Sequence, residues 1–172
     1  MRLFVAINLG DEIKDALCAV EKELQAQGAR GNFSKRENLH LTLAFLGEVE
    51  QSRVKAVREA MAAAEFAPFT VEVSSAGRFK RDEGDILWIG LGASRELTAL
   101  QVSLVRELKA RGFSPDDKPF KPHLTIGRKI TGAGRIPESA NGLSQRVESI
   151  ELMLSERING KLTYTPIYSR KA

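Results

Sequence analysis

The sequence predicts an α+β fold that is internally duplicated, with each half running from a strand through a helix to a second strand. The two histidines of the chain, His40 and His123, open the same tripeptide, His-Leu-Thr, at an offset of 83 residues. At an offset of 84, KELQAQG (22–28) aligns with RELKARG (106–112), with identical Glu, Leu, Ala and Gly and polar residues elsewhere. These two repeats predict that the halves of the chain fold alike.

Each half opens with an apolar strand and continues into an amphipathic helix. RLFVAIN (2–8) in the first half corresponds to DILWIGL (85–91) in the second. Apolar residues then recur at helical spacing over 11–27 and over 94–111, which favours packing of both helices on a sheet. We expect one N-cap and two C-terminal glycines to bound these helices: Ser94, Gly28 and Gly112.

The rest of the chain adds one helix and three strands, which we expect at 52–65, 69–79, 147–156 and 161–169. The segment RFKRDEGD (78–85) is typical of a loop and would join the halves. TGAGRIPESANG (131–142) is a second loop, and it lacks the Lys-Ser/Thr of a nucleotide-binding P-loop. At this length we expect one domain over 1–172, made of two lobes of about 1–84 and 85–172 that can exchange strands.

Composition excludes several classes of protein. The chain is 42% apolar and 28% charged, as in globular proteins, and no apolar run has the length of a membrane span. The single cysteine, Cys18, cannot form an internal disulfide, which fits the reducing cytoplasm. We expect a monomer without a membrane partner. One Cys and two His also leave no cluster of the structural-zinc type, and we expect neither a metal nor another cofactor.

Charge is distributed unevenly over a chain whose net charge is +4. Residues 1–86 hold 12 Lys and Arg against 14 Asp and Glu, whereas residues 87–172 hold 14 against 8. A basic half suits an anionic partner such as RNA, and it equally fits a solvated surface with no partner.

The repeated tripeptide places an imidazole beside a hydroxyl. Residues i and i+2 of a strand share a face, so His40 and Thr42 would point to one side and the intervening leucine to the core. His123 and Thr125 would do the same. If a pseudo-two-fold axis relates the halves, all four polar groups meet across one cleft.

Two imidazoles and two hydroxyls suit the opening of a phosphodiester. One histidine can deprotonate the nucleophile while the other protonates the leaving oxygen, because the pKa of histidine lies near neutral pH. Threonine hydroxyls can donate to the non-bridging oxygens, and no metal is required. The structural alternatives are histidines that only satisfy hydrogen bonds and threonines that only favour strands. Repetition of the whole phrase at matching places favours a site.

The chain resembles the two-histidine phosphoesterase superfamily, whose hallmark is two copies of His-x-Thr/Ser-x with x usually hydrophobic. Within it, the chain resembles the bacterial and archaeal RNA 2′,3′-cyclic phosphodiesterases, also called 2′-5′ RNA ligases. Four segments carry the resemblance: RLFVAI (2–7), ENLHLTLAFLGEV (37–49), PFKPHLTIGR (119–128) and GKLTYTPI (160–167).

The resemblance implies a bilobal fold in which two sheets face a central cleft and helices pack outside. It implies hydrolysis of RNA 2′,3′-cyclic phosphate ends, tRNA fragments among them, to 2′-phosphates, with ATP-independent 2′-5′ ligation as the reverse chemistry. His40 and His123 would be the catalytic pair, His123 as base and His40 as acid. Thr42 and Thr125 would bind the phosphate, and Arg128 matches a phosphate-contacting position.

Two features depart from a simple transfer of these roles. Strict alternation along the strand would point Arg128 with Leu124 to the face away from His123, so a phosphate contact needs a bulge or the end of the strand. NFSKRE (32–37) stands where relatives often have an aromatic-rich stretch, and Phe33 is the residue here that could stack on a base.

Two alternative functions remain open on the sequence. One is a cyclic phosphodiesterase that acts on small nucleotide or sugar phosphates. The other is a nucleotide- or RNA-binding module without turnover, which would not need two proton-transfer groups.

Overall fold

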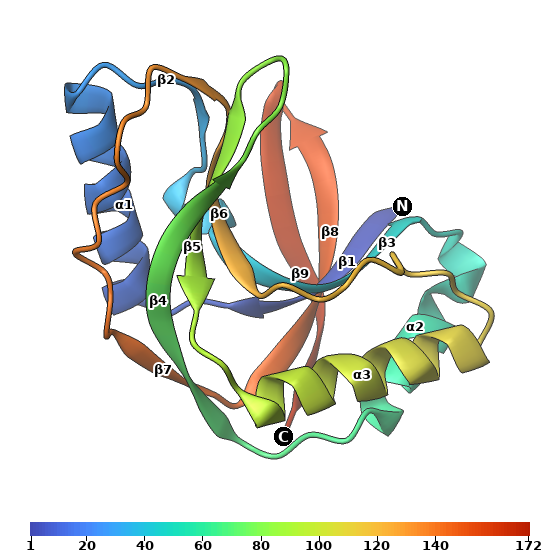
Figure 1. Ribbon diagram of the computed structural model, residues 1–172. Helices are drawn as coiled ribbons and strands as arrows, with labels where there is room; N and C mark the ends of the chain where they lie inside the picture. Colours follow the sequence, from blue (N-terminus) through green and yellow to red (C-terminus); the bar gives the residue numbers. More distant parts are fainter.

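The computed structural model describes all 172 residues and arranges nine strands in two curled antiparallel sheets (Figure 1). One sheet, here the His40 sheet, has the order β3-β1-β8-β9. Its strands are β1 (Arg2–Asn8), β3 (His40–Glu48), β8 (Ser149–Ile158) and β9 (Lys161–Lys171). The other, here the His123 sheet, has the order β2-β6-β5-β4-β7. Its strands are β2 (Arg30–Phe33), β4 (Phe69–Phe79), β5 (Asp85–Leu91), β6 (His123–Thr131) and β7 (Ser144–Val147).

Each sheet takes strands from both halves of the chain. The order β3-β1-β8 in the His40 sheet matches β6-β5-β4 in the His123 sheet, so β8 and β4 are exchanged at equivalent places, and β9 and β2 also lie in the sheet of the other half. The expected lobes of about 1–84 and 85–172 therefore do not coincide with the two sheets. The reason is the short connection between β4 and β5, because strands joined by a tight hairpin pair with each other and β4 is thereby drawn into the sheet of the second half.

The expected loop at 78–85 is shorter than predicted. Arg78 and Phe79 continue β4 and pair with Leu87 and Ile86 of β5, so only residues 80–84 form the turn. The charged residues of this segment favoured a loop in the sequence. Pairing with β5, and not local polarity, decides that Arg78 and Phe79 are in a strand. The short strands β2 and β7 were not expected.

The three predicted helices are confirmed as α1 (Asp11–Ala26), α2 (Val54–Ala63) and α3 (Arg95–Ala110). The Oγ of Ser94 accepts a hydrogen bond from the backbone N–H of Leu97 at 3.1 Å, as expected of an N-cap. Gly28 and Gly112 follow α1 and α3 with φ of +102° and +83°, the left-handed conformation that ends helices. None of the helices has the length and apolar character needed to cross a bilayer.

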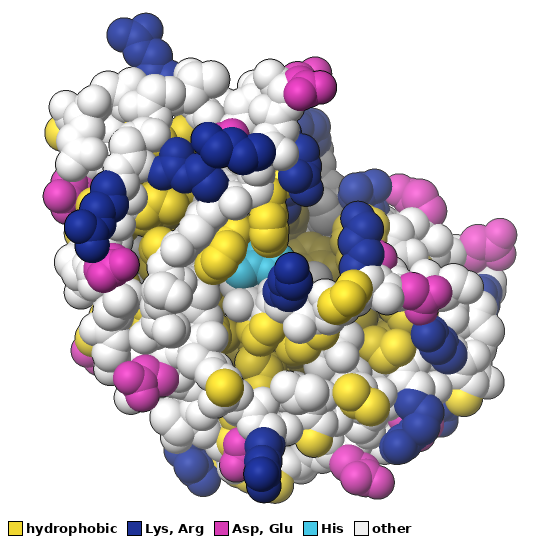
Figure 2. Space-filling view, viewed as in Figure 1, with side chains coloured by type: hydrophobic (Ala, Val, Ile, Leu, Met, Phe, Trp, Pro, Cys, Tyr) yellow, Lys and Arg dark blue, Asp and Glu magenta, His cyan; other side chains and the backbone are white.

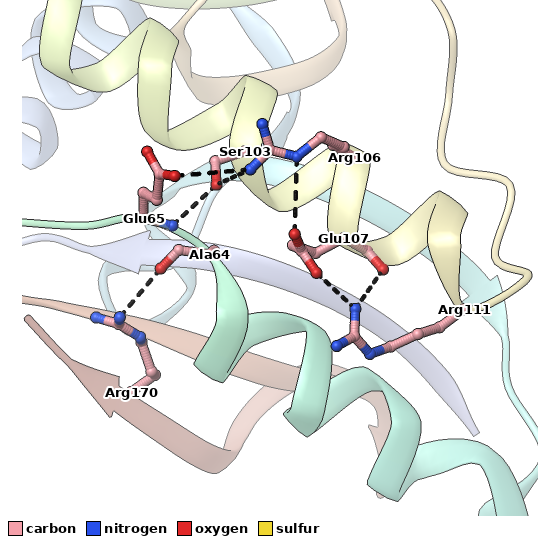
Figure 3. Close-up of polar contacts among 7 residues, drawn as sticks. All are labelled: Ala64, Glu65, Ser103, Arg106, Glu107, Arg111 and Arg170. Carbon is pink, nitrogen blue, oxygen red and sulfur yellow. Dashed lines mark hydrogen bonds and ion pairs between the residues drawn. The ribbon is translucent and has the colours of Figure 1, made fainter.

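Polar contacts fasten α2 to α3 and to β9 (Figure 3). The Oγ of Ser103 in α3 accepts a hydrogen bond at 2.8 Å from the backbone N–H of Glu65, just beyond α2. Arg170 of β9 donates to the carbonyl oxygen of Ala64 at 3.0 Å. Within α3, Arg111 forms an ion pair with Glu107 at 2.7 Å. The helix pair is thus fixed on the outside of the sheets, beside β3 and β4.

The apolar face of each sheet enters one continuous core, which includes Leu41, Leu43, Leu124 and Ile126. These residues alternate with the His and Thr side chains of β3 and β6, as the strand pattern predicted. Packing of the leucine and isoleucine side chains therefore forces the histidines and threonines to the opposite face of each sheet.

Candidate active site

His40 and His123 are the first residues of β3 and β6, and both are held in the same way. Nδ1 of His40 lies 2.7 Å from the carbonyl oxygen of Asn38, and Nδ1 of His123 lies 2.6 Å from that of Lys121. A carbonyl oxygen can only accept, so Nδ1 carries the proton in both neutral rings. Each Nε2 is thereby left unprotonated, as an acceptor on the side of the ring away from the backbone.

His40 is enclosed by aromatic rings. Its ring centroid lies 4.9 Å from that of Phe4 and 5.2 Å from that of Tyr164, which meets it edge-on. Nε2 of His40 accepts a hydrogen bond from the Oγ1 of Thr42 at 2.8 Å. Burial lowers the pKa of His40, and the positive charge of Arg128 and the nearby His123 act in the same direction, whereas the bond to Asn38 acts against them.

His123 has a matching but more open setting. Its ring lies 5.5 Å from that of Phe79 and 6.2 Å from that of Trp88, the one tryptophan of the chain. Thr125 lies two residues further along β6, half-buried, in register with Trp88. Each predicted histidine and threonine thus lies on the face of its sheet away from the core.

A hollow of about 440 Å³ is lined by residues of both sheets. Thr42 comes from the His40 sheet and His123 from the His123 sheet. Figure 2 shows an imidazole at the floor of such a hollow, with Lys and Arg side chains on the surrounding rim. Phe45, Phe79 and Phe120 add apolar surface to its wall, and Arg81, Lys118 and Lys121 add positive charge. We call this space, with its 15 lining residues, the active-site hollow.

A bulge in β6 turns Arg128 to the face that carries His123. The pairing with β5 shifts register between Thr125 and Gly127, so two consecutive residues, Ile126 and Gly127, are buried. Arg128 is therefore exposed on the opposite side, where its charge acts on His40. The sequence indicated that Arg128 could reach a phosphate only through such a bulge or at the end of the strand, and the bulge is present.

Backbone packing holds this bulge in place. Lys129 has φ of 55°, an uncommon conformation for a residue with a side chain. The backbones of Gly31 and Gly84 both press on Lys129, and a Cβ atom on Gly84 would lie 2.6 Å from its carbonyl carbon. Glycine at these two places is what lets the neighbouring turns approach the strained residue.

Phe45 takes the place in β3 that Arg128 takes in β6. Both lie five residues after a histidine, and β3 has a matching register shift that buries Leu43 and Ala44 in succession. Phe45 is 40% exposed and lines the active-site hollow. Phe33, considered above for base stacking, instead packs against Gly127 at the edge of the core. The repeat offset was the signal that could have pointed to Phe45.

Asn38 is a further residue that sequence reasoning missed. Its side-chain amide donates to the carbonyl oxygen of Leu162 at 2.9 Å and accepts from the backbone N–H of Tyr164 at 3.4 Å. Asn38 thereby fastens β9 to the turn before His40 and keeps the Tyr164 ring against the imidazole. The corresponding Lys121 makes no such side-chain bond and projects into the active-site hollow.

The sequence profile of the 2′-5′ RNA ligase superfamily matches residues 13–156 of the chain. The chain belongs to this superfamily. It is 39% identical over 130 residues to an RNA 2′,3′-cyclic phosphodiesterase of Archaeoglobus fulgidus, with 74% of this chain and 72% of that protein covered. It is 30% identical over 167 residues to an RNA 2′,3′-cyclic phosphodiesterase of Escherichia coli K12, covering 96% and 93%.

Solved structures of the superfamily have the same architecture. The crystal structure of E. coli LigT complexed with 3′-AMP matches with a TM-score of 0.84 at 31% identity, over 99% of this chain and 96% of that one. The two facing sheets and the exterior helices are thus the fold that the resemblance implied. The structure contains no group of three or more His, Cys, Asp or Glu side chains placed to hold a metal ion.

Proposed function

We propose that this protein hydrolyses the 2′,3′-cyclic phosphate ends of RNA to 2′-phosphates. The observation that carries the proposal is the pair of histidines, one from each sheet, whose Nδ1 atoms are held alike by backbone carbonyls. His123 lines the active-site hollow, and His40 bonds to Thr42, which also lines it. A binding site alone has no use for two imidazoles whose unprotonated Nε2 atoms can each exchange a proton. The names of the superfamily relatives support RNA cyclic phosphates as the substrate class.

Hydrolysis proceeds by in-line displacement at phosphorus. His123 takes a proton from water as the new P–O bond forms, and His40 gives a proton to O3′ as the P–O3′ bond breaks. The phosphate stays on O2′. The hydroxyls of Thr42 and Thr125 donate to the non-bridging oxygens, and Arg128 adds positive charge where negative charge develops.

The low pKa of His40 shapes its role as acid. Burial lowers the pKa of His40 and so favours the neutral imidazole, which must gain a proton before it can protonate O3′. A bound phosphodiester supplies negative charge that favours this proton. A substrate with sulfur in place of O3′ tests the assignment, because a thiolate leaves without a general acid. His40→Ala should recover much of its lost rate on this substrate and His123→Ala should not.

Ligation uses the same groups with a different nucleophile. If an RNA 5′-hydroxyl replaces water, the same base activates it, O3′ leaves, and a 2′-5′ linkage forms without ATP. Water is far more abundant, so hydrolysis dominates unless two RNA ends are held together. A 3′-5′ junction or an absolute ATP requirement would contradict this chemistry.

The decisive assay follows a 2′,3′-cyclic mononucleotide and a cyclic-ended oligonucleotide in EDTA, with products identified by ³¹P NMR. We expect both to yield 2′-phosphates. Turnover of the mononucleotide alone would identify a small-molecule cyclic phosphodiesterase, and binding without turnover would identify a binding module. A 3′-phosphate product, or activity that EDTA removes and Mg²⁺, Mn²⁺ or Zn²⁺ restores, would overturn the proposed mechanism.

We also propose that the protein acts as a cytoplasmic monomer and that tRNA fragments are among its substrates. The free thiol of Cys18, with no partner cysteine in the chain, supports a reducing compartment. Sedimentation analysis and turnover of cyclic-ended tRNA halves test the two parts separately.

A further inference from the structure

A second hollow adjoins the active-site hollow. It has a volume of about 400 Å³ and is lined by the β4–β5 turn and the bulged part of β6. Its lining residues are Arg81, Asp82, Glu83, Gly84, Ile86, Arg128 and Lys129. Arg81 lines both spaces and so marks the place where they meet. We call the second space the Arg81 hollow.

The two spaces differ in chemistry. The wall of the active-site hollow includes Phe45, Phe120 and Val105, which suit the base and ribose of a terminal nucleotide. The Arg81 hollow has one apolar lining residue, Ile86, and its other side chains are charged. Its volume lies within the range of small-ligand sites, about 300–1,000 Å³. A backbone unit of a nucleic acid fits such a space better than a base does.

Two guanidinium groups of the Arg81 hollow are free of acidic partners. Lys129 forms an exposed ion pair with Glu83 at 3.7 Å, whereas Arg81 and Arg128 form none. The Arg81 guanidinium bonds to the carbonyl oxygen of Lys80 at 2.8 Å and lies 5.7 Å above the Phe79 ring, which itself contacts His123. An unpaired arginine is thus fixed next to the catalytic pair.

We infer that the Arg81 hollow binds the phosphodiester that joins the cyclic-ended nucleotide to the nucleotide before it. The inference rests on the proposed function. An RNA with a cyclic phosphate at its 3′ end continues only in the 5′ direction, so the chain must leave the active-site hollow at one place. The guanidinium of Arg81 has no acidic partner in this adjoining space and matches a phosphodiester in charge and geometry, whereas Arg128 serves the reacting phosphate. The substrate is therefore an RNA chain of at least two nucleotides in preference to a mononucleotide.

Length dependence tests the inference. We compare kcat/KM for a 2′,3′-cyclic mononucleotide with that for cyclic-ended di- and trinucleotides at several salt concentrations. The ratio of dinucleotide to mononucleotide should be about fivefold, the upper range for one exposed ion pair. The dependence of log kcat/KM on log salt should be steeper by ~0.7 for the dinucleotide, as for one more phosphate contact on a single strand.

Variants of the hollow separate charge from structure. Arg81→Ala should remove most of the dinucleotide advantage and the added salt dependence, and Arg81→Lys should keep part of both. Asp82→Asn should increase the advantage, because it removes a negative charge from the same hollow. Arg146→Ala is the matched control, since this exposed arginine lies on β7, at the far edge of the sheet, and pairs with Glu148.

The outcomes distinguish the inference from the proposed function. Equal kcat/KM at all lengths, or a length advantage that Arg81→Ala leaves intact, overturns the inference and leaves the function standing. If neither substrate turns over, the proposed function fails. The inference can then still be tested by calorimetry, with 2′-phosphate-ended mono- and dinucleotides binding to the wild type and to Arg81→Ala. Tighter binding of the dinucleotide that is lost in Arg81→Ala supports the inference, and its absence overturns it.

Discussion

The carbonyl oxygen of Asn38 lies 2.7 Å from Nδ1 of His40, and the side chain of the same asparagine binds β9 on both sides of Thr163. One residue thus fixes the tautomer of His40 and keeps the ring of Tyr164 against it. The carbonyl of Lys121 holds His123 at 2.6 Å without such a clamp. The two histidines are therefore equivalent in backbone support and unequal in burial.

Asn38→Ala should lower kcat by ~10-fold and leave KM nearly unchanged, as a loss of positioning and not of substrate contact. Loss of the clamp exposes the imidazole, so the pKa of His40 should rise toward its ordinary value. The pH profile of kcat/KM measures this shift. Thr163→Ala, on the same strand between the clamped residues, should leave the profile in place. A profile identical to the wild type in Asn38→Ala would contradict the positioning role.

His40→Ala and His123→Ala should each lower turnover by ~10²–10⁴-fold, the range of lost acid–base catalysis. Because both histidines act in one step, the double variant should lose less than the product of the single losses. Steady-state rates on a cyclic-ended oligonucleotide measure this. Near-normal turnover in either single variant would rule out the two-histidine mechanism.

The pH dependence of kcat/KM should be bell-shaped, because one histidine must be protonated and the other neutral. Because the pKa of His40 is lowered, the midpoint of one limb of this bell-shaped profile should lie below the ordinary pKa of histidine. Trp88 provides a second observable, since its ring lies 6.2 Å from that of His123 and a protonated imidazole quenches indole fluorescence. A fluorescence transition that persists in His123→Ala would show that another group is responsible for the quenching.

Thr42→Val and Thr125→Val should each reduce kcat by up to ~10²–10³-fold, as for loss of one donor to a developing oxyanion. Valine nearly keeps the shape of threonine and favours strands, so folding should be preserved. Circular dichroism and thermal melting serve as the check on folding. If both variants kept wild-type kinetics, the threonines would be strand-forming residues only.

Glu21 should make the protein less stable as pH rises. Its side chain is buried on α1, one carboxylate oxygen has no hydrogen-bond partner, and burial raises its pKa from 4.5 to about 8. Between these values the folded state binds more protons than the unfolded state, so the free energy of unfolding falls with pH.

Glu21→Gln removes this titration and should be at least ~1 kcal/mol more stable than the wild type at pH 8, with little difference at pH 4. Urea denaturation at several pH values measures both. Glu23→Gln, at an exposed position of the same helix, should leave the pH dependence unchanged. If the free energy of unfolding of Glu21→Gln fell with pH as steeply as that of the wild type, other groups would be responsible for the pH dependence.

Local periodicity by itself determined much of this protein. Helical spacing in 11–27, 52–65 and 94–111 marked the three helices, and alternation around His40 and His123 placed imidazole and hydroxyl on one face of each strand. Helical spacing and strand alternation depend only on residues close together in the chain, so the sequence alone shows them. The repeat of the His-Leu-Thr phrase then linked the two strands to one chemistry.

Contacts between distant residues decided the rest. The place of β4 in the His123 sheet follows from pairing across a hairpin, and the direction of Arg128 follows from a bulge held by Gly31 and Gly84. The burial of His40 depends on Tyr164, 124 residues away from it, brought there through Asn38. Register and burial arise only when separate segments meet. The sequence therefore indicated which groups are candidates for catalysis, and the tertiary structure set the direction of their side chains and lowered the pKa of His40.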